Sequence, residues 1–145
     1  MLAAKIPDTP LSLSNNAAVT AANVIGLTWT PGIYNGGASV LDYKISYDQG
    51  TNSYKTLVSG VVATSYTATL LTAGLTFKFK IQARNVIGLS VLSSEVSILC
   101  ARIPDAPTTL ANALAVTSDV QIGLSWADGL TNGGSTILDY KVSFD

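Results

Sequence analysis

Histidine is absent from the 145 residues, and cysteine occurs once, at Cys100. Histidine is the commonest general base and the commonest metal ligand in proteins, and without it the usual serine and cysteine triads are excluded. One thiol cannot form an intramolecular disulfide, and by itself it cannot hold a metal. The sequence therefore predicts a protein that is not an enzyme and that binds no metal or other cofactor.

Charge is also scarce. Charged residues make up 12% of the chain, its net charge is −1, and 48% of its residues are hydrophobic. A chain of this composition is globular rather than disordered, and it has no general attraction for nucleic acid or for an anionic membrane. No apolar run approaches the roughly 18 residues that a membrane span needs. We therefore expect no nucleic-acid partner and no membrane insertion by this segment.

An internal repeat is the clearest positive signal. Residues 1–48 align with residues 98–145 without a gap and are identical at 25 of 48 positions. The stretch LDYKISYD at 41–48, for example, returns as LDYKVSFD at 138–145. Two unrelated segments would not match at this level, so the pattern indicates a tandem duplication with a period of 97 residues.

The alignment predicts three parts. Residues 1–4 correspond to the end of a preceding repeat, residues 5–101 form one complete repeat (the first unit), and residues 102–145 form the first half of the next (the second unit). A repeat of 97 residues can bury a core without disulfides. Two explanations of the incomplete half stay open. The sequence is a window on a longer periodic chain, or another chain supplies the missing strands by strand exchange.

The apolar residues alternate with a period of two, which is typical of strands with one buried face. One example is Phe77, Phe79 and Ile81 alternating with lysines and a glutamine. Turn residues such as those at 31–32, 35–37, 49–50 and 73–74 separate the runs. The pattern predicts an all-β, seven-stranded antiparallel sandwich of immunoglobulin-like type. The expected strands, A to G with C′ in place of D, cover residues 11–19, 23–30, 39–48, 53–59, 64–70, 75–85 and 91–100, and the first three recur in the second unit.

The first unit resembles a fibronectin type III domain. The motifs that carry the resemblance are Ile-Pro-x-x-Pro at 6–10, Trp29 two residues after Leu27, Tyr-x-Ile-x-Tyr at 43–47, and the run from Leu71 to Gly88 that includes Phe77, Phe79, Ile81, Ala83 and Asn85. The resemblance covers 5–101 fully and 102–145 through strand C. It implies a non-catalytic binding or scaffolding module, common in extracellular and surface proteins. One departure is Phe77, which stands where such sandwiches carry a corner tyrosine.

Five basic residues form the first candidate site, called the basic face below. In this type of fold, strands C, C′ and F share one sheet, so their outward basic residues can gather on one surface. One interpretation is a solvated sheet face whose lysines oppose aggregation. The other is a docking face for an acidic partner or for a neighbouring array. The residues are Lys44, Lys55, Lys78, Lys80 and Arg84.

Other polar clusters have turn-like interpretations. The segment 48–52 is a faint match to a calcium loop, but it lacks the spaced ligands and closing glutamate, so we interpret it as a C–C′ turn. Asp8 and Asp105 lie between prolines, where a capping role is favoured over a cation bridging two domains. The glycine pairs 36–37 and 133–134 do not open a helix and are interpreted as B–C turns rather than phosphate loops.

The junction between units, residues 100–107, is the second candidate site. Prolines fix φ and favour an extended backbone, so the junction should be semi-rigid. Cys100 aligns with Ala3, which favours a small, half-buried apolar residue at a strand end over a reactive thiol or an interchain disulfide. The junction residues in question are Cys100, Ile103, Pro104, Asp105 and Pro107.

Three functional hypotheses follow. The first is a structural segment of a large extracellular or cell-surface protein, acting as an extended spacer, filament or adhesive stalk through end-to-end stacking. Its partners would be neighbouring repeats and other copies alongside. The second is a recognition module that binds a protein or a glycan through the B–C and F–G loops or the basic face. The third is an accessory domain of a larger enzyme.

Overall fold

The computed structural model describes residues 3–145, so Met1 and Leu2 of the expected preceding repeat lie outside it. Seven strands lie in the first unit and two in the second, and the described chain forms no helix that could span a bilayer. The strands are β1 (Leu11–Asn15), β2 (Ile25–Thr30), β3 (Asp42–Tyr47), β4 (Lys55–Val61), β5 (Ser65–Ala68), β6 (Thr76–Arg84), β7 (Val96–Leu99), β8 (Thr108–Asn112) and β9 (Leu124–Ala127).

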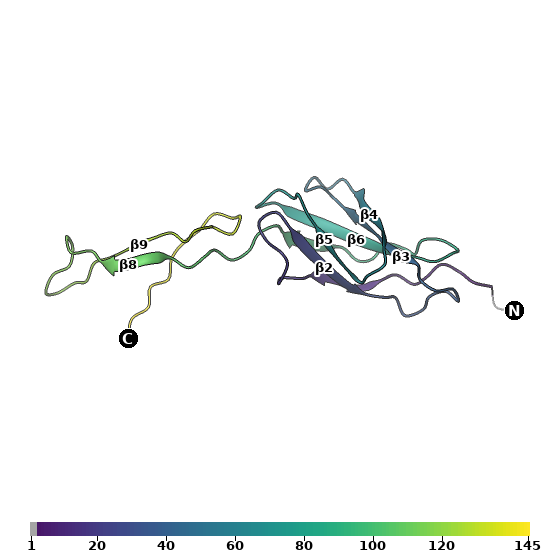
Figure 1. The fold of residues 1–145 in the computed structure, drawn as a ribbon, viewed down its shortest axis with the longest axis horizontal. Coiled ribbons are helices and arrows are strands. Elements are labelled where there is room, and N and C mark those ends of the chain that lie inside the picture. The colour runs from purple at the N-terminus through teal and green to yellow at the C-terminus, as the bar shows by residue number, and fades with distance from the viewer. Residues whose placement is uncertain (1–2) are drawn as a thin grey trace.

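The first unit is a sandwich of two antiparallel sheets, as the alternation predicts (Figure 1). One sheet has the order β1-β2-β5, and the other has the order β4-β3-β6-β7. β3 and β6 pair over six residue pairs from Asp42↔Arg84 to Tyr47↔Phe79, which makes them the centre of the larger sheet. The all-β, immunoglobulin-like fold class is confirmed.

The core lies between the sheets and consists of the residues that the period of two assigns to the inner faces. Phe79, Ile81 and Ile45 are fully buried on the larger sheet, and Ile25 and Leu27 face them from the smaller one. In the described residues, the members of the buried hydrophobic core cluster all lie between Ile25 and Cys100. The first unit therefore contains a complete core of its own.

The corner position at Phe77 is filled by packing. Its ring is 4% exposed and stacks on Tyr47 with a centroid separation of 6.5 Å. Burial of an aromatic ring supplies most of what a tyrosine would contribute there, apart from its hydroxyl bond. The departure from the family pattern is therefore compatible with an intact core.

Strand G is shorter than the sequence predicts. Residues 91–95 run beside β6 but are not a strand, and β7 begins only at Val96. The backbone N–H groups of Ala83 and Ile81 donate to the hydroxyl oxygens of Ser90 and Ser93 at 3.0 and 2.9 Å. Because serine side chains take the place of backbone acceptors, this edge is held without a regular ladder.

The β8–β9 pair of the second unit has the same register as the β1–β2 pair of the first unit. The pairings Thr108↔Ala127 and Asn112↔Leu124 reproduce Leu11↔Thr30 and Asn15↔Leu27 shifted by 97 residues. The predicted recurrence of strand C is wrong, because residues 136–145 form no strand. In the first unit β3 forms its ladder with β4 and β6, and no described strand lies beside residues 139–144.

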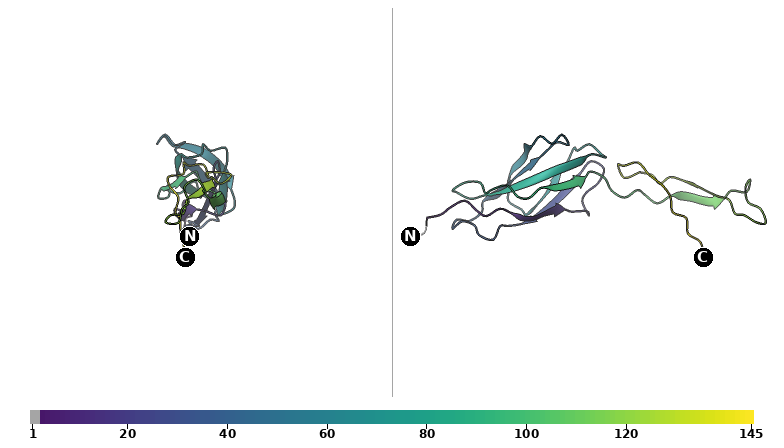
Figure 2. Two further views of the ribbon diagram at one scale, coloured as in Figure 1. Left: turned by 90° about the vertical axis from the view of Figure 1, so that its left-hand side faces the viewer. Right: turned by 180° about the vertical axis from the view of Figure 1, so that it is seen from behind.

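The two units lie end to end. Figure 2 shows the chain along its long axis, where the second unit falls in front of the first, and from behind, where both stretch along one line. The connection between β7 and β8 is residues 100–107 and contains no strand or helix. The result is an elongated chain with the N-terminal part of the first unit at one end and the β8–β9 hairpin towards the other.

Candidate functional site

The larger sheet carries four of the five basic-face residues on its outer surface. The register places Lys44 opposite Gln82, Ser46 opposite Lys80, and Lys78 opposite Ser97, while the residues between them point into the core. Residues directly opposite each other in a pair share a face. Lys44, Lys78, Lys80 and Arg84 therefore lie on one side, as predicted.

Lys55 corrects the expected grouping. Its partner across β3–β4 is Tyr47, whose ring stacks on Phe77 and Phe79 of the core. The register consequently assigns Lys55 to the other face of the sheet, at the exposed edge strand β4. The expectation assumed a regular alternation, but the β3–β4 pairing contains register shifts between Tyr43 and Ser46.

The outer face is also less basic than the sequence suggests, because acidic residues lie within it. Glu95 lies 3.8 Å from both Lys78 Nζ and Lys80 Nζ, and it accepts a hydrogen bond from the Tyr54 hydroxyl. Lys80 Nζ is also 4.5 Å from the centre of the Tyr54 ring. The Tyr54 hydroxyl bond and the two ammonium groups lower the pKa of Glu95, although desolvation opposes them.

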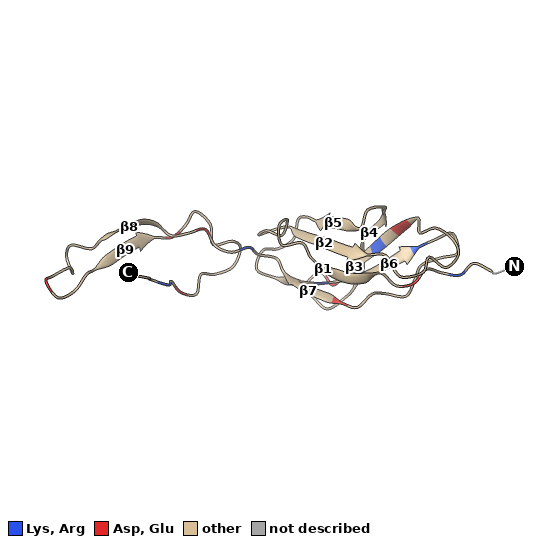
Figure 3. Cartoon of the chain, turned by 90° about the horizontal axis from the view of Figure 1, so that it is seen from below, with Lys and Arg blue, Asp and Glu red and all other residues tan. Residues whose placement is uncertain are grey.

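A second ion pair, between Arg84 and Asp42, lies at the end of the β3–β6 ladder. Arg84 Nε donates to Asp42 Oδ1 at 2.9 Å, and a second guanidinium nitrogen reaches the other carboxylate oxygen, which gives a bidentate contact. This hydrogen bond is the main cause of the lowered pKa of Asp42. In Figure 3 blue and red segments alternate where β3 and β6 run side by side. The sequence pattern can indicate Asp42, because it alternates in phase with Lys44, whereas Glu95 is 15 residues or more from its partners Lys78, Lys80 and Tyr54.

Asp48 is a turn residue, as predicted, but it is far more buried than a plain turn would require. Its side chain is 2% exposed and accepts hydrogen bonds from the backbone N–H groups of Gly50, Asn52 and Lys78 at 2.9 to 3.2 Å. The carboxylate thus joins the β3–β4 turn to β6. No group of three or more His, Cys, Asp or Glu suited to a metal occurs within residues 3–145.

At the junction, Cys100 is a core residue. Its side chain is fully buried, its N–H donates to Leu75 O at 2.9 Å, and its carbonyl accepts from Gly74 N at 3.0 Å. Desolvation raises the pKa of its thiol, which keeps it in the neutral, unreactive form. Cys100 is therefore more buried than the sequence predicts, and this burial favours a structural role for its side chain over a reactive thiol.

Asp105 and Asp8 act as local connectors. Arg102 donates to the Asp105 carboxylate at 2.8 Å, and the Asp105 N–H donates to Thr131 O at 3.0 Å. In the first unit the Asp8 carboxylate accepts from Tyr34 N at 3.2 Å. These contacts favour the turn or capping interpretation of both aspartates. Ile103, between the arginine and the first junction proline, is 84% exposed.

Asn85 organises the opposite end of the first unit. Its side chain, 2% exposed, donates to Lys5 O at 2.7 Å and to Asn35 O at 2.9 Å, and it accepts from the backbone N–H groups of Ile87 and Gly88. One amide therefore holds the N-terminal segment, the B–C turn and the F–G loop together. Around it, large apolar side chains remain exposed on the two loops, namely Ile33, Tyr34, Val86 and Ile87.

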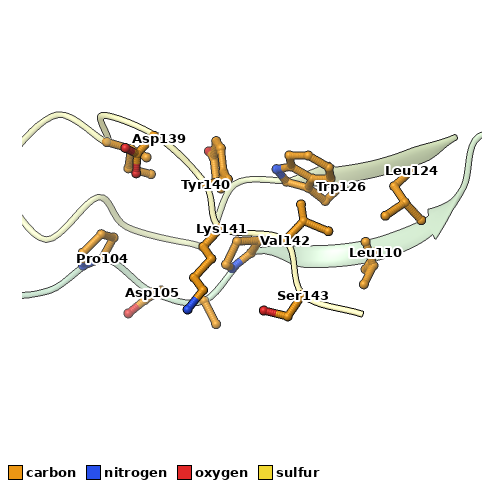
Figure 4. A pocket seen from close by; sticks show the side chains of 13 residues that line it. Pro104, Asp105, Leu110, Leu124, Trp126, Asp139, Tyr140, Lys141, Val142 and Ser143 are labelled. Atoms are coloured by element: carbon orange, nitrogen blue, oxygen red, sulfur yellow. The ribbon is translucent and has the colours of Figure 1, made fainter. Parts of the chain in front are cut away.

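The second unit contains an open apolar groove of about 470 Å³. Figure 4 shows Trp126, Leu124 and Leu110 gathered around Val142. Trp126 packs edge-on against Tyr140 with the centroids 5.4 Å apart, as Trp29 does against Tyr43 at 5.3 Å. Trp126 is nevertheless 36% exposed, whereas Trp29 is 4% exposed. The groove is thus the counterpart of the first unit's core with one side uncovered.

Comparison with known proteins matches residues 8–98 to the family model described as fibronectin type III domain. Among curated proteins the chain is 30% identical to endoglucanase B of Cellulomonas fimi over 99% of its length and 32% identical to chitinase A1 of Niallia circulans over 92%. It spans only 13% and 19% of those two proteins. Domains A168–A170 of titin superpose on 67% of this chain, and 33% of theirs, with a TM-score of 0.61 at 22% identity.

Proposed function

Because this chain belongs to the fibronectin type III domain family, we propose that it is a non-catalytic structural module, a stretch of end-to-end domains that acts as an extended spacer. The first unit is one such domain, and the second unit, with its matching register and Trp–Tyr pair, is the beginning of another. The finer role within this proposal is that of a spacer, filament or adhesive stalk in a larger extracellular or cell-surface protein.

The junction carries this proposal. Only residues 100–107 connect the units, and two of these are prolines. The Arg102 N–H donates to Gly133 O at 2.8 Å, which ties the connection to the second unit. The Gly74 N–H donates to Cys100 O at 3.0 Å, which ties it to the first unit. A short, hydrogen-bonded connection with fixed φ angles holds neighbouring domains in line rather than letting them swing.

The relatives support a spacer inside a larger protein. Two of them are named as an endoglucanase and a chitinase, and this chain corresponds to less than a fifth of each. A module of this kind would hold other domains of an enzyme apart, which favours the accessory-domain hypothesis as one form of the spacer. For either form we propose an extracellular or cell-surface location, which the names of these relatives support.

We expect the two units of the chain to tumble as one elongated body. The proline rings and the junction hydrogen bonds restrict rotation between the units, so ¹⁵N relaxation should give both units one common, anisotropic tumbling time. Replacing Pro104 and Pro107 together with glycine should separate the two tumbling times. Independent tumbling in the unmodified chain would rule out a semi-rigid spacer.

Recognition through surfaces is the second candidate function, and the exposed apolar loops favour it. Ile33 and Val86 are 75% and 71% exposed on the B–C and F–G loops, which Asn85 holds in a fixed arrangement. A preordered pair of loops with apolar tips is suited to binding a protein or a glycan at low entropic cost. The basic face offers a separate surface, with Lys44 as its cation outside the ion pairs to Glu95 and Asp42 found in residues 3–145.

Neutralising Lys44, Lys78 and Lys80 to glutamine should distinguish these surfaces. If the basic face binds an acidic partner or a neighbouring array, the triple variant should lose association and its dependence on salt should fall. Stability should change by less than about 1 kcal/mol, since exposed ion pairs contribute little. Lateral association by light scattering at two salt concentrations is the measurement, and Lys55→Gln, on the other face, is the matched control. Unchanged association would exclude the basic face.

A further inference from the structure

The second unit contacts the first through a glycine turn. A Cβ atom built on Gly134 would lie 3.0 Å from the Cα and Cβ atoms of Ala22 and 3.3 Å from the Cβ of Ala73. A Cβ on Gly74 would in turn lie 3.1 Å from the carbonyl oxygen of Gly134. Contacts of 3.0 to 3.4 Å are tighter than nearly all real Cβ contacts, so a side chain at either glycine would push the facing segment back by a few tenths of an ångström. The contact therefore favours glycine on one side and small residues on the other.

The same turn occurs at the free end of the first unit. In both turns the asparagine side chain accepts from the second glycine, at 2.9 Å for Asn35 and 3.0 Å for Asn132. Lys5 N donates to Gly36 O at 2.9 Å, as Arg102 N does to Gly133 O at 2.8 Å. Gly37 and Gly134 have similar φ angles of +81° and +91°. The two turns therefore share one conformation.

What differs is the surroundings of the second glycine. A Cβ on Gly37 would meet only the Cα of Ala4, at 3.8 Å, which is an ordinary contact. Gly36, by contrast, is required by its own unit, because its Cβ would lie 2.2 Å from Lys5 O. Within the described chain, the space beside Gly37 is thus open where the space beside Gly134 is filled by another domain.

We propose that the Asn-Gly-Gly turn is the docking element of the array, and that residues 35–37 receive the end of another copy of the first unit that carries Ala22, Ala73 and Gly74. This rests on the proposed spacer function and names the surface that makes the stack. The partner must present small residues in its A–B and E–F loops. In the second unit the position of Ala22 is held by Asp119, so that end presents a different surface.

The intact chain provides the first test, with Gly37→Asn as the matched control for Gly134→Asn. Asparagine tolerates positive φ, so both substitutions carry a similar local cost, but only the one at 134 projects a side chain onto Ala22 and Ala73. Spin labels at exposed Ser59 and Ala111, with Cys100 changed to alanine as at position 3, report the distance between the units. We expect Gly134→Asn to broaden the distance distribution about twofold, as for a looser interface, and Gly37→Asn to leave it unchanged.

A chain of two consecutive copies of residues 5–101 provides the second test. It is expected to fold because the first unit contains its whole core. Labels at Ser59 of both copies should give a narrow distribution that broadens with Gly37→Asn in the downstream copy and not with the same change upstream. The docking role would be overturned if Gly37→Asn gave equally wide distance distributions in the upstream and downstream copies. It would also be overturned if Gly134→Asn left the distribution of the intact chain narrow. Either result would leave the spacer function intact. A broad distribution in the parent chain would overturn both.

Discussion

Replacing Asp48 with alanine is expected to lower the free energy of unfolding of the first unit by about 3 kcal/mol. The carboxylate is 2% exposed and accepts three backbone N–H groups, of which Lys78 N belongs to the central strand β6. Alanine would leave these donors without their partner, and donors that remain buried are costly to leave unpaired. Asp119→Ala, at an exposed aspartate without a hydrogen bond or ion pair in residues 3–145, is the matched control.

The same residue predicts a loss of stability in acid. Burial raises the pKa of Asp48. The hydrogen bonds from Lys78, Gly50 and Asn52, together with the charge of Lys78, lower it by more than burial raises it, so the net pKa lies below its ordinary value. A carboxyl with a depressed folded pKa contributes stability above its unfolded pKa of about 4 and loses it as pH falls through the folded value. The lowered pKa values of Asp42 and Glu95 act in the same direction.

Denaturant unfolding between pH 7 and pH 3 measures both effects. The parent chain should lose stability below about pH 4, and Asp48→Asn should show a smaller loss, because its side chain cannot be protonated in this range. The difference between the two curves isolates Asp48 from the other carboxyls. Parallel curves, or an Asp48→Ala variant as stable as Asp119→Ala, would show that the turn does not depend on this carboxylate.

Appending residues 49–101 after Asp145 should complete the second unit. Residue 145 corresponds to residue 48, so the added segment continues the repeat in register and supplies strands equivalent to β4 to β7. Leu124 and Val142 are 43% and 54% exposed in the chain, whereas their counterparts Leu27 and Ile45 are buried. Burying a side chain of this size contributes about 1.5–3 kcal/mol, so covering the groove is strongly favourable.

Tryptophan emission and limited proteolysis measure the result. Trp126 should move from a partly exposed to a buried environment, with a blue shift of its emission, and residues 102–145 should become resistant to cleavage. The control carries aspartate in place of the isoleucine equivalent to Ile81 in the added segment, which would place a charge in the new core. If the parent extension leaves Trp126 as exposed as this control does, the second unit is not the first half of a matching domain.

The pattern of residues was sufficient for the fold, and the reason is local. The strands that build most of the core, β2, β3 and β6, coincide with runs of period two, since alternation directly assigns one face to the core. Strand G is predicted too long, because residues before Val96 bond to β6 through the hydroxyls of Ser90 and Ser93 rather than through a regular ladder. A pattern of apolar residues does not indicate such bonds. Strand C is predicted in the second unit because residues 138–145 match residues 41–48. A strand also needs a hydrogen-bonded neighbour, and none lies beside this segment in the described chain.

The candidate sites divide in the same way. By itself the sequence determined the sandwich, the internal match at a spacing of 97 residues, the outward direction of Lys44, Lys78 and Lys80, and a short proline-containing junction, because these follow from periodicity and from residue-by-residue identity. Only the tertiary structure decided that Glu95 neutralises part of the basic face, that Lys55 lies on the other side, and that Gly134 seats on Ala22 and Ala73. Such contacts join residues far apart in the chain, and their partners are set by sheet register and by how one domain meets the next, neither of which is written in any one segment.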